Sequence, residues 1–125
     1  MSVTIDARPA WVDTGLLIVP GTTYLFTASG RWKDARIETD ADGYPSANIF
    51  QQATERLRRV PEARWFALIG AVDRQPSTQF VIGSRATFRA ATGGQLTCFA
   101  NDLRWFYFNN SGSVTLTMEV VSGPR

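Results

Sequence analysis

The sequence predicts an all-β fold, an antiparallel β-sandwich of jelly-roll type with one short inserted helix. Eight or so short runs are rich in β-branched and aromatic residues and are separated by turn residues, whereas only one segment has helical spacing. Four Trp, three Tyr and eight Phe in 125 residues favour strands. A chain of this length forms one domain with a sizeable core, so we expect a single domain over residues 1–125.

The N-terminal third should form three strands. Val3 and Ile5 alternate with polar residues, which is typical of a half-buried strand. Gly15 is a candidate bulge in the second strand, and Pro20-Gly21 is the turn that ends it. The expected strands cover residues 2–7, 11–19 and 22–32.

Residues 33–47 are expected to be a loop, and residues 48–59 a helix. Asp40-Ala41-Asp42-Gly43 resembles the start of a calcium-binding loop, but Gln51 stands where that motif needs a bidentate Glu, so we interpret it as a turn. Asn48 could cap the helix, and Pro61 would end it. The apolar residues at helical spacing, expected to face the protein, are Phe50, Ala53 and Leu57.

The remaining strands are expected in the C-terminal half. Residues 113–121 alternate apolar and polar side chains, which indicates a half-buried strand. Cys98 lies in a strand-like run, and as the only cysteine it is expected to be a small buried hydrophobic residue. The expected strands cover residues 64–72, 79–83, 86–90, 95–100 and 113–121.

Composition excludes several functional classes. The chain has no histidine, which excludes His-ligated zinc and Ser-His-Asp triads. A net charge of +2 gives no argument for nucleic acid, and the cluster Arg56, Arg58 and Arg59 is interpreted as a solvated helix face. No apolar run is long enough to predict membrane insertion. The first residues lack the features of a signal peptide, so we expect synthesis in the cytoplasm and leave open a non-classical export.

The segment 101–112 carries the candidate chemistry. It lies between two expected strands and contains Asp102, Asn109 and Asn110, whose side-chain oxygens suit Ca²⁺. The alternative is a long hairpin loop closed by an Asn-Asn-Ser-Gly turn, because Asn and Gly tolerate positive φ.

This segment resembles the calcium-dependent galactose-binding bacterial lectins of the PA-IL (LecA) family. In that family an Asn-Asp pair opens the calcium loop and Asn-Asn-Ser-Gly-Ser closes it, with six residues between the Asp and the Asn pair. Asn101-Asp102 and the run 109–113 keep this spacing. Pro20-Gly21, the run 24–30 and Arg31-Trp32 also look like the family's N-terminal third.

The resemblance implies a galactose-binding-domain-like sandwich that binds a sugar through Ca²⁺ and assembles as a dimer or tetramer. It assigns as metal ligands the side chains of Asp102, Asn109 and Asn110 and the carbonyls of Phe106 and Ala35. Since only Asp102 is charged in this set, weak to moderate calcium affinity is expected. The sugar-binding residues that follow from it are Asp102, Asn109, Leu103, Tyr44 and Trp105.

Two departures leave the preferred sugar open. Arg104-Trp105 replaces a Pro-Gly of the family, and Tyr44 and Ala47 stand where the family uses His and Gln to contact the sugar. Trp105 and Tyr107 could stack on an apolar sugar face, or pack within the loop or against another subunit.

Three functions therefore compete at this stage. The first is a non-catalytic lectin for galactose or a similar glycan. The second is a sandwich of the same fold that has lost sugar binding and serves as an interaction or assembly module. The third is a glycosidase that pairs Asp102 with Asp34 or Glu38, which we reject because the sequence shows neither a nucleophile motif nor an environment that raises a pKa.

Overall fold

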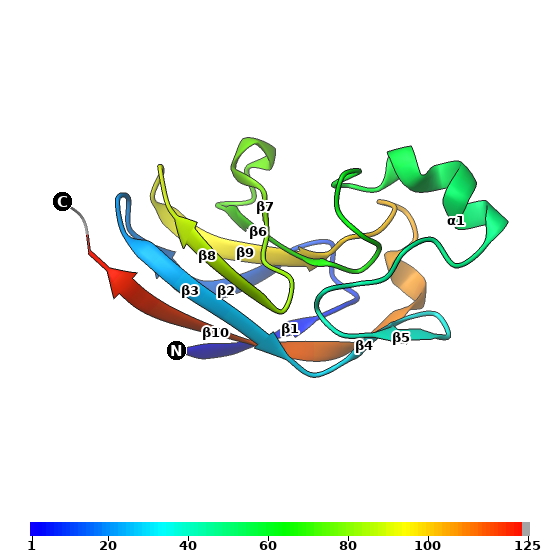
Figure 1. Ribbon diagram of the computed structural model, residues 1–125, viewed down its shortest axis with the longest axis horizontal. Helices are drawn as coiled ribbons and strands as arrows, with labels where there is room; N and C mark the ends of the chain where they lie inside the picture. The colour runs from blue at the N-terminus through cyan, green and yellow to red at the C-terminus, as the bar shows by residue number, and fades with distance from the viewer. Residues whose placement is uncertain (124–125) are drawn as a thin grey trace.

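The computed structural model describes residues 1–123, which form two antiparallel sheets packed face to face (Figure 1). The predicted all-β sandwich with one short helix, α1 (Ile49–Thr54), is confirmed. The six-stranded sheet contains β5 (Ile37–Thr39), β4 (Trp32–Asp34), β10 (Asn110–Ser122), β3 (Thr23–Ser29), β8 (Arg85–Arg89) and β1 (Ser2–Asp6). The four-stranded sheet contains β2 (Val12–Ile18), β9 (Gly94–Ala100), β6 (Leu68–Val72) and β7 (Phe80–Val81). Short 3₁₀ helices cover Glu55–Leu57, Pro76–Thr78 and Tyr107–Asn109.

Strand β10 is the axis of the larger sheet. It pairs with β1 along one edge and with β3 and then β4 along the other. The single strand expected over residues 22–32 is wrong, because Gly30 has φ 99° and interrupts the ladder between β3 and β4. The expected loop 33–47 also contains β5, which forms a hairpin with β4. Strand β10 begins at Asn110, earlier than expected, and so reaches β4.

The smaller sheet contains the predicted irregularity in β2. The β2–β9 register shifts between Asp13 and Leu17, around Gly15, whose φ is 75°. The Gly15 N–H donates to the Gln95 side-chain oxygen at 2.8 Å instead of to a backbone carbonyl of the neighbouring strand. The strand expected over 64–72 is shorter than predicted, because Phe66 takes a left-handed φ of 60° and β6 begins only at Leu68.

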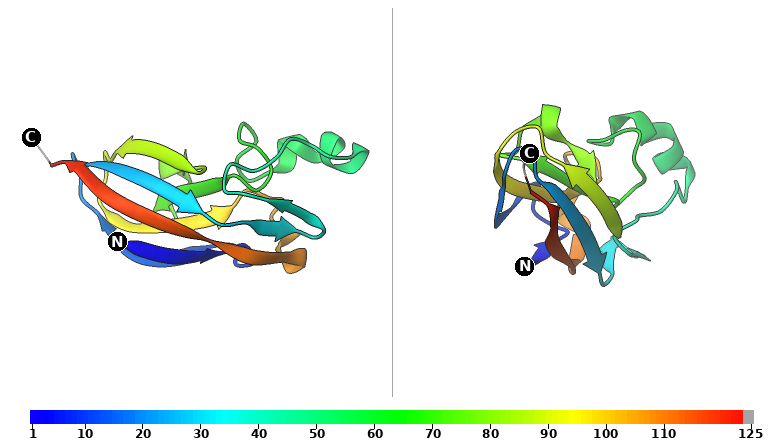
Figure 2. Two further views of the ribbon diagram at one scale, coloured as in Figure 1. Left: turned by 60° about the horizontal axis from the view of Figure 1, so that its bottom comes forward. Right: turned by 60° about the vertical axis from the view of Figure 1, so that its left-hand side comes forward.

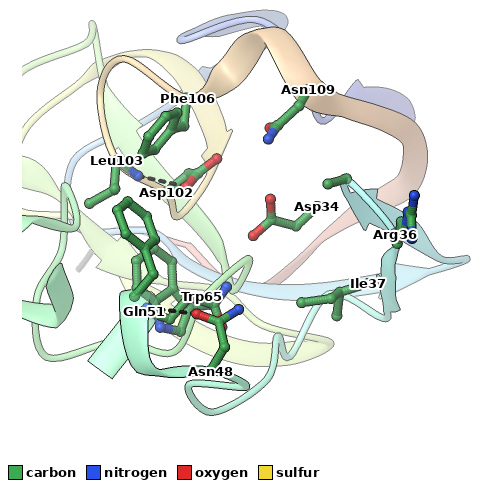
Figure 3. A pocket seen from close by; sticks show the side chains of 12 residues that line it. Asp34, Arg36, Ile37, Asn48, Gln51, Trp65, Asp102, Leu103, Phe106 and Asn109 are labelled. Carbon is green, nitrogen blue, oxygen red and sulfur yellow. Dashed lines mark hydrogen bonds between the residues drawn. The ribbon is translucent and has the colours of Figure 1, made fainter. Parts of the chain in front are cut away.

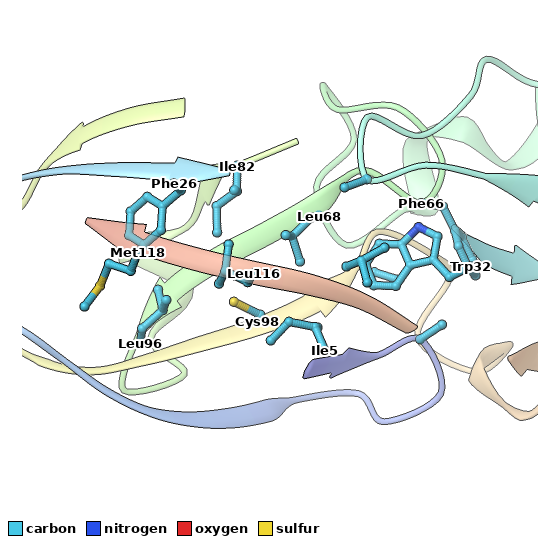
Figure 4. Packing of buried hydrophobic residues seen from close by; sticks show 14 of the residues in the cluster. Ile5, Phe26, Trp32, Phe66, Leu68, Ile82, Leu96, Cys98, Leu116 and Met118 are labelled. Atoms are coloured by element: carbon cyan, nitrogen blue, oxygen red, sulfur yellow. The ribbon is translucent and has the colours of Figure 1, made fainter. Parts of the chain in front are cut away.

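The core lies between the two sheets (Figure 4). Phe26, Trp32 and Leu116 from the larger sheet face Leu68 and Cys98 from the smaller one, and all five are fully buried. The prediction that Cys98 is a buried hydrophobic residue is confirmed, and burial raises the pKa of its thiol.

A second cluster lies on the outer face of the smaller sheet. Ile69 of β6 and Phe99 of β9 pack there against Val60, Ala63 and Ala67, with Trp11 alongside. This packing fixes the segment that follows α1. Figure 2 shows that α1, the β4–β5 hairpin and the loop before β10 gather at one end of the molecule.

The inserted helix differs from the expectation in length and in the face it buries. Asn48 caps it as predicted, since its Oδ1 accepts the Gln51 N–H at 2.9 Å. The α-helix ends at Thr54, however, and Phe50 and Leu57 are 54% and 53% exposed. Gln51 is the buried residue, because its side chain has hydrogen-bonding partners beneath the helix. Among residues 1–123, no helix has the length and apolar character that a membrane span needs.

Candidate functional site

A cavity of about 400 Å³ opens between the β4–β5 hairpin, α1 and the loop that precedes β10 (Figure 3). Its walls come from segments far apart in the sequence, which the strand pairing brings together. The residues around it are Asp34, Ala35, Arg36, Ile37, Asn48, Phe50, Gln51, Trp65, Asp102, Leu103, Phe106 and Asn109.

The β4–β5 hairpin forms one side of the cavity. Its two-residue turn is Ala35-Arg36, and Ala35 has a left-handed φ of 53°, which is strained for a residue with a Cβ. The Ala35 N–H donates to the Asn109 carbonyl at 3.1 Å and so ties the hairpin to the opposite loop. This contact holds Ala35 and Asn109 next to each other at the edge of the cavity.

Asp102 and Asn110 carry two buried oxygens without a hydrogen-bonding partner. Asp102 is 2% exposed, and its Oδ1 accepts the Leu103 N–H at 2.7 Å while its Oδ2 has no partner. Asn110 is 3% exposed, and its Nδ2 donates to the Ala7 carbonyl at 3.0 Å while its Oδ1 has no partner. An unsatisfied buried acceptor costs about 1–3 kcal/mol, more when it is charged, so a bound cation would remove a real penalty here.

The cavity also concentrates negative charge. Burial, chiefly, and the neighbouring Asp34 carboxylate raise the pKa of Asp102 to about 7, although the hydrogen bond from the Leu103 N–H favours its charged form. Burial also raises the pKa of Asp34, against the effect of a hydrogen bond from Tyr44. The ion pairs found among residues 1–123, Arg31–Glu38 and Arg74–Asp13, include neither carboxylate.

Asp34 is held by a short chain of hydrogen bonds that starts on α1. The Gln51 Oε1 accepts the Ala47 N–H at 2.7 Å, which leaves its Nε2 to donate to the Tyr44 hydroxyl at 2.6 Å. That hydroxyl donates to Asp34 Oδ2 at 2.5 Å. Burial and the contact with Asp34 raise the pKa of Tyr44, which keeps it a donor. The backbone pairing of Tyr44 with Trp65 fixes this segment next to the cavity.

Hydrogen bonds to the segment 59–64 hold the loop 101–109 in place. The Asn101 side chain accepts the Val60 N–H at 3.0 Å and donates to three carbonyls of the segment 60–64. The Arg59 N–H donates to the Asp102 carbonyl at 3.1 Å, and its guanidinium donates to the Tyr107 hydroxyl at 3.0 Å. Arg59 was expected on a solvated helix face. It instead lies over the Phe99 ring at 3.4 Å, because the chain leaves the helix before reaching it.

Aromatic side chains form the outer rim of the cavity. Phe50 and Phe106 meet edge to face at 5.6 Å between ring centres, and Phe106 lies 6.0 Å from Phe108. Phe50, Phe108 and Trp105 are all more than half exposed. The lining thus combines polar groups with the aromatic rings of Phe50 and Phe106, which is the usual make-up of a small-ligand site.

Most of the residues predicted from the sequence lie around the cavity. Asp102, Leu103, Phe106, Asn109 and Ala35 line it, and the Asn110 side chain lies next to Asp102. Tyr44 is buried behind Asp34, with its hydroxyl already engaged, and is not a wall residue. Trp105 is 59% exposed and lies outside the cavity lining.

Sequence reasoning missed Asn48, Gln51 and Trp65, and it considered Asp34 only as a catalytic acid. Asn48 and Gln51 bring polar side chains from the start of α1 to the cavity. They lie close in sequence to Ala47, which stands where the lectin family has a sugar-contacting residue. The helix cap predicted at Asn48 was the one local signal for this residue, because it places a polar side chain where the preceding loop meets α1. No local signal pointed to Asp34 or Trp65.

The donor set fits a hard cation that prefers oxygen. Among the residues described, no three or more His, Cys, Asp or Glu side chains gather where they could hold a metal ion by themselves. Calcium also takes carboxamide and backbone carbonyl oxygens. Asp102, Asn109 and Asn110, with the nearby carbonyls of Phe106 and Ala35, provide oxygens of these kinds.

Comparison with known proteins yields a fold relationship. No protein-family model matches the chain, and no curated protein matches it. One solved structure similar to it is described as the EclA N-terminal domain, a PllA-like lectin, with a TM-score of 0.69. The two share 19% sequence identity over 95% of this chain and 94% of that one. The chain therefore shares its overall fold with a lectin domain.

Proposed function

We propose that this chain is a carbohydrate-binding protein, a lectin without catalytic activity, that binds galactose or a related sugar through Ca²⁺ held by the loop 101–112. The observation that carries the proposal is the pair of buried, unpartnered oxygens, Asp102 Oδ2 and Asn110 Oδ1. Both belong to the segment 101–112 that adjoins the cavity, and a cation bound there would satisfy both of them.

The metal would be held by protein oxygens from two segments of the chain, the loop 101–112 and the turn of the β4–β5 hairpin. Asp102, Asn109 and Asn110 would contribute side chains, and Phe106 and Ala35 would contribute carbonyls. Calcium takes six to eight ligands, so this set leaves positions for two neighbouring hydroxyls of a sugar. A bound ion would supply the anchoring of those hydroxyls, and Asp102 and Asn109 would accept hydrogen bonds from the same groups.

The other walls suit a pyranose ring. Asn48 and Gln51 bring carboxamides to the side of the cavity formed by α1, and Phe50 and Phe106 bring apolar faces for the sugar's C–H groups. Galactose is the first candidate ligand because the loop 101–112 resembles that of galactose-binding lectins. Tyr44 and Trp105, which were expected to contact the sugar, do not line the cavity, so the preferred sugar has to be measured.

A thermal-shift series tests the proposal. The protein is heated in EDTA, in millimolar Ca²⁺, in Mg²⁺, and in Ca²⁺ with galactose, glucose, mannose or fucose. We expect a rise in Tm with Ca²⁺ and a further rise with galactose or a related sugar, because a ligand that binds only the folded state stabilises it. The control is Asp102→Asn, which keeps the shape of the side chain and should lose both shifts. No shift in the unmodified protein at millimolar Ca²⁺ would contradict the proposal.

The exposed apolar side chains support a second candidate, an interaction or assembly module. Ile49 and Phe50 of α1 and Trp105 and Phe108 of the loop are all more than half exposed at the same end of the molecule. Such groups often mark a contact surface. Under this alternative, sedimentation shows a homo-oligomer that Phe108→Ser disrupts, and neither Ca²⁺ nor sugar changes the Tm.

The two carboxylates in the cavity make a direct check for catalysis worthwhile. Asp34 and Asp102 both line it, whereas Glu38 does not. We expect no hydrolysis of aryl glycosides, because the proposed role of Asp102 is to bind the metal. Hydrolysis that Asp102→Asn abolishes would overturn the non-catalytic part of the proposal.

A further inference from the structure

Asp34 lies directly beside one of the proposed metal ligands. It ends β4, and the β4–β10 register places it opposite Asn110. Residues directly opposite each other on paired antiparallel strands point to the same face of the sheet, with Cβ atoms about 4.5–5.5 Å apart. The burial pattern agrees, since Asp34 and Trp32 are buried while Lys33 between them is exposed. The Asp34 carboxylate therefore shares the face of the Asn110 carboxamide.

One oxygen of Asp34 remains available to the cavity. Tyr44 occupies Oδ2, and no other hydrogen bond or ion pair to this carboxylate occurs among residues 1–123. Figure 3 shows Asp34, Asp102 and Asn109 arranged around one shared space, with their polar ends directed into it. Arg36 also lines the cavity, but among residues 1–123 it forms no ion pair with either carboxylate. Two carboxylates that share a small space repel each other, and a divalent cation between them removes that repulsion.

The hydrogen-bond chain from α1 fixes the direction in which Asp34 points. Because the Gln51 Oε1 is taken by the Ala47 N–H, its amide group can only donate to Tyr44, and Tyr44 can then only donate to Asp34. Groups that hold a metal ligand in this way typically govern affinity by fixing the ligand's orientation. The inserted helix thus reaches the proposed metal site through two side chains.

We propose that Asp34 is a second carboxylate ligand of the calcium ion, held in place by Tyr44 and Gln51. The proposal rests on the proposed function and deepens it. With Asp34 and Asp102 together, the site carries two negative charges instead of the single one inferred from the sequence. Affinity for calcium rises with the charge of the ligands, so the site should bind more tightly than the loop 101–112 alone would.

Calorimetric titration of Ca²⁺ into the full chain tests this assignment. Asp34→Asn keeps the size of the side chain and removes its charge, and we expect it to weaken calcium binding at least about tenfold. The matched control is Glu38→Gln, which removes the same charge from the neighbouring strand of the hairpin but lies outside the cavity lining. Its effect should stay below about twofold, because an exposed charge is screened by solvent and salt.

Two further measurements separate a metal ligand from a structural residue. The Tm of Asp34→Asn in EDTA should equal or exceed that of the unmodified protein, because the substitution removes a buried charge that has no basic partner. Tyr44→Phe leaves Asp34 charged and removes its hydrogen bond. We expect it to weaken calcium binding by about tenfold or more, as removal of a group that orients a metal ligand typically does.

Each contrary result has a distinct meaning. Equal calcium affinities for Asp34→Asn and the unmodified protein would overturn the inference and leave the proposed function intact. Unchanged calcium affinity with lost sugar binding would also overturn it, since Asp34 would then contact the sugar instead of the metal. No calcium binding by the unmodified protein would overturn both the inference and the proposed function.

Discussion

At the scale of single residues, Asp102 is the most unusual side chain of the cavity. It lies almost fully buried, one of its oxygens has no partner, and its pKa is raised to about 7 by burial and by Asp34. The folded protein therefore holds a proton on this side chain that the unfolded chain releases near its ordinary pKa of 3.8.

This difference sets the sign of a pH effect. Because the folded state binds the proton more tightly, the contribution of Asp102 to stability is fully present below about pH 4 and is lost as the pH rises through about 7. In EDTA, we expect the unfolding free energy of the unmodified protein to fall over this window relative to that of Asp102→Asn. Urea unfolding of both proteins from pH 4 to pH 8 measures the difference. If the difference in unfolding free energy between the two proteins stays constant from pH 4 to pH 8, the raised pKa of Asp102 is contradicted.

Cys98 gives a residue-scale prediction about the core. It is fully buried between the sheets, away from the cavity. Cys98→Ser introduces a hydroxyl without an obvious partner, which should cost about 1–3 kcal/mol of stability. Calcium and sugar binding should be unaffected, as calorimetry of the folded variant would establish. A large binding defect in a well-folded Cys98→Ser protein would show that the core and the site are coupled.

The sequence indicated some site residues and missed others for a physical reason. Asp102, Asn109 and Asn110 lie within one loop, so their spacing alone suggested a shared site. Asp34 lies far from them along the chain and reaches Asn110 only through the β4–β10 pairing. That pairing requires β10 to begin at Asn110, and nothing in the local pattern of residues 109–113 sets that start.

At the scale of elements, the alternation of apolar and polar residues predicted most strands well, and the backbone conformation of single residues explains two exceptions. Residues 22–32 were predicted as one strand, yet the positive φ of Gly30 separates β3 from β4. The left-handed φ of Phe66 delays the start of β6 to Leu68. The helix was misjudged in another way. Its apolar residues have helical spacing, but Gln51 is buried because Tyr44 and Ala47 offer it hydrogen bonds. Such partners become visible only once the fold brings them together.

The segment after α1 holds the loop 101–109 in place. Arg59 connects it to Asp102 through its N–H and to Tyr107 through its guanidinium. Arg59→Ala should cost about 1.5–3 kcal/mol of stability, the range of hydrogen bonds to charged groups, and should weaken calcium binding. Urea unfolding and calorimetry measure the two effects. Arg56→Ala, at an exposed position nearby, is the control and should change stability by less than about 0.5 kcal/mol. Equal effects of the two substitutions would contradict the bracing role of Arg59.

At the scale of the whole molecule, two sheets and their core place three connections at one end of the sandwich (Figure 1). Strand β10 links two of them, since it follows the loop 101–109 and also pairs with β4 of the β4–β5 hairpin. The sandwich is the part of the structure that composition and periodicity predicted, and it is shared with a lectin domain at 19% identity. The inserted helix was also predicted, but its contacts with the cavity through Asn48 and Gln51 are visible only in the folded chain.

A crystal structure of the protein grown with Ca²⁺ and soaked with galactose, or with the sugar that gives the largest thermal shift, tests the central claim most directly. We predict one calcium ion about 2.3–2.6 Å from oxygens of Asp102, Asn109 and Asn110, with two sugar hydroxyls completing its coordination. A sugar bound away from this loop, or an ion that leaves Asp102 Oδ2 and Asn110 Oδ1 without contacts, would contradict the claim.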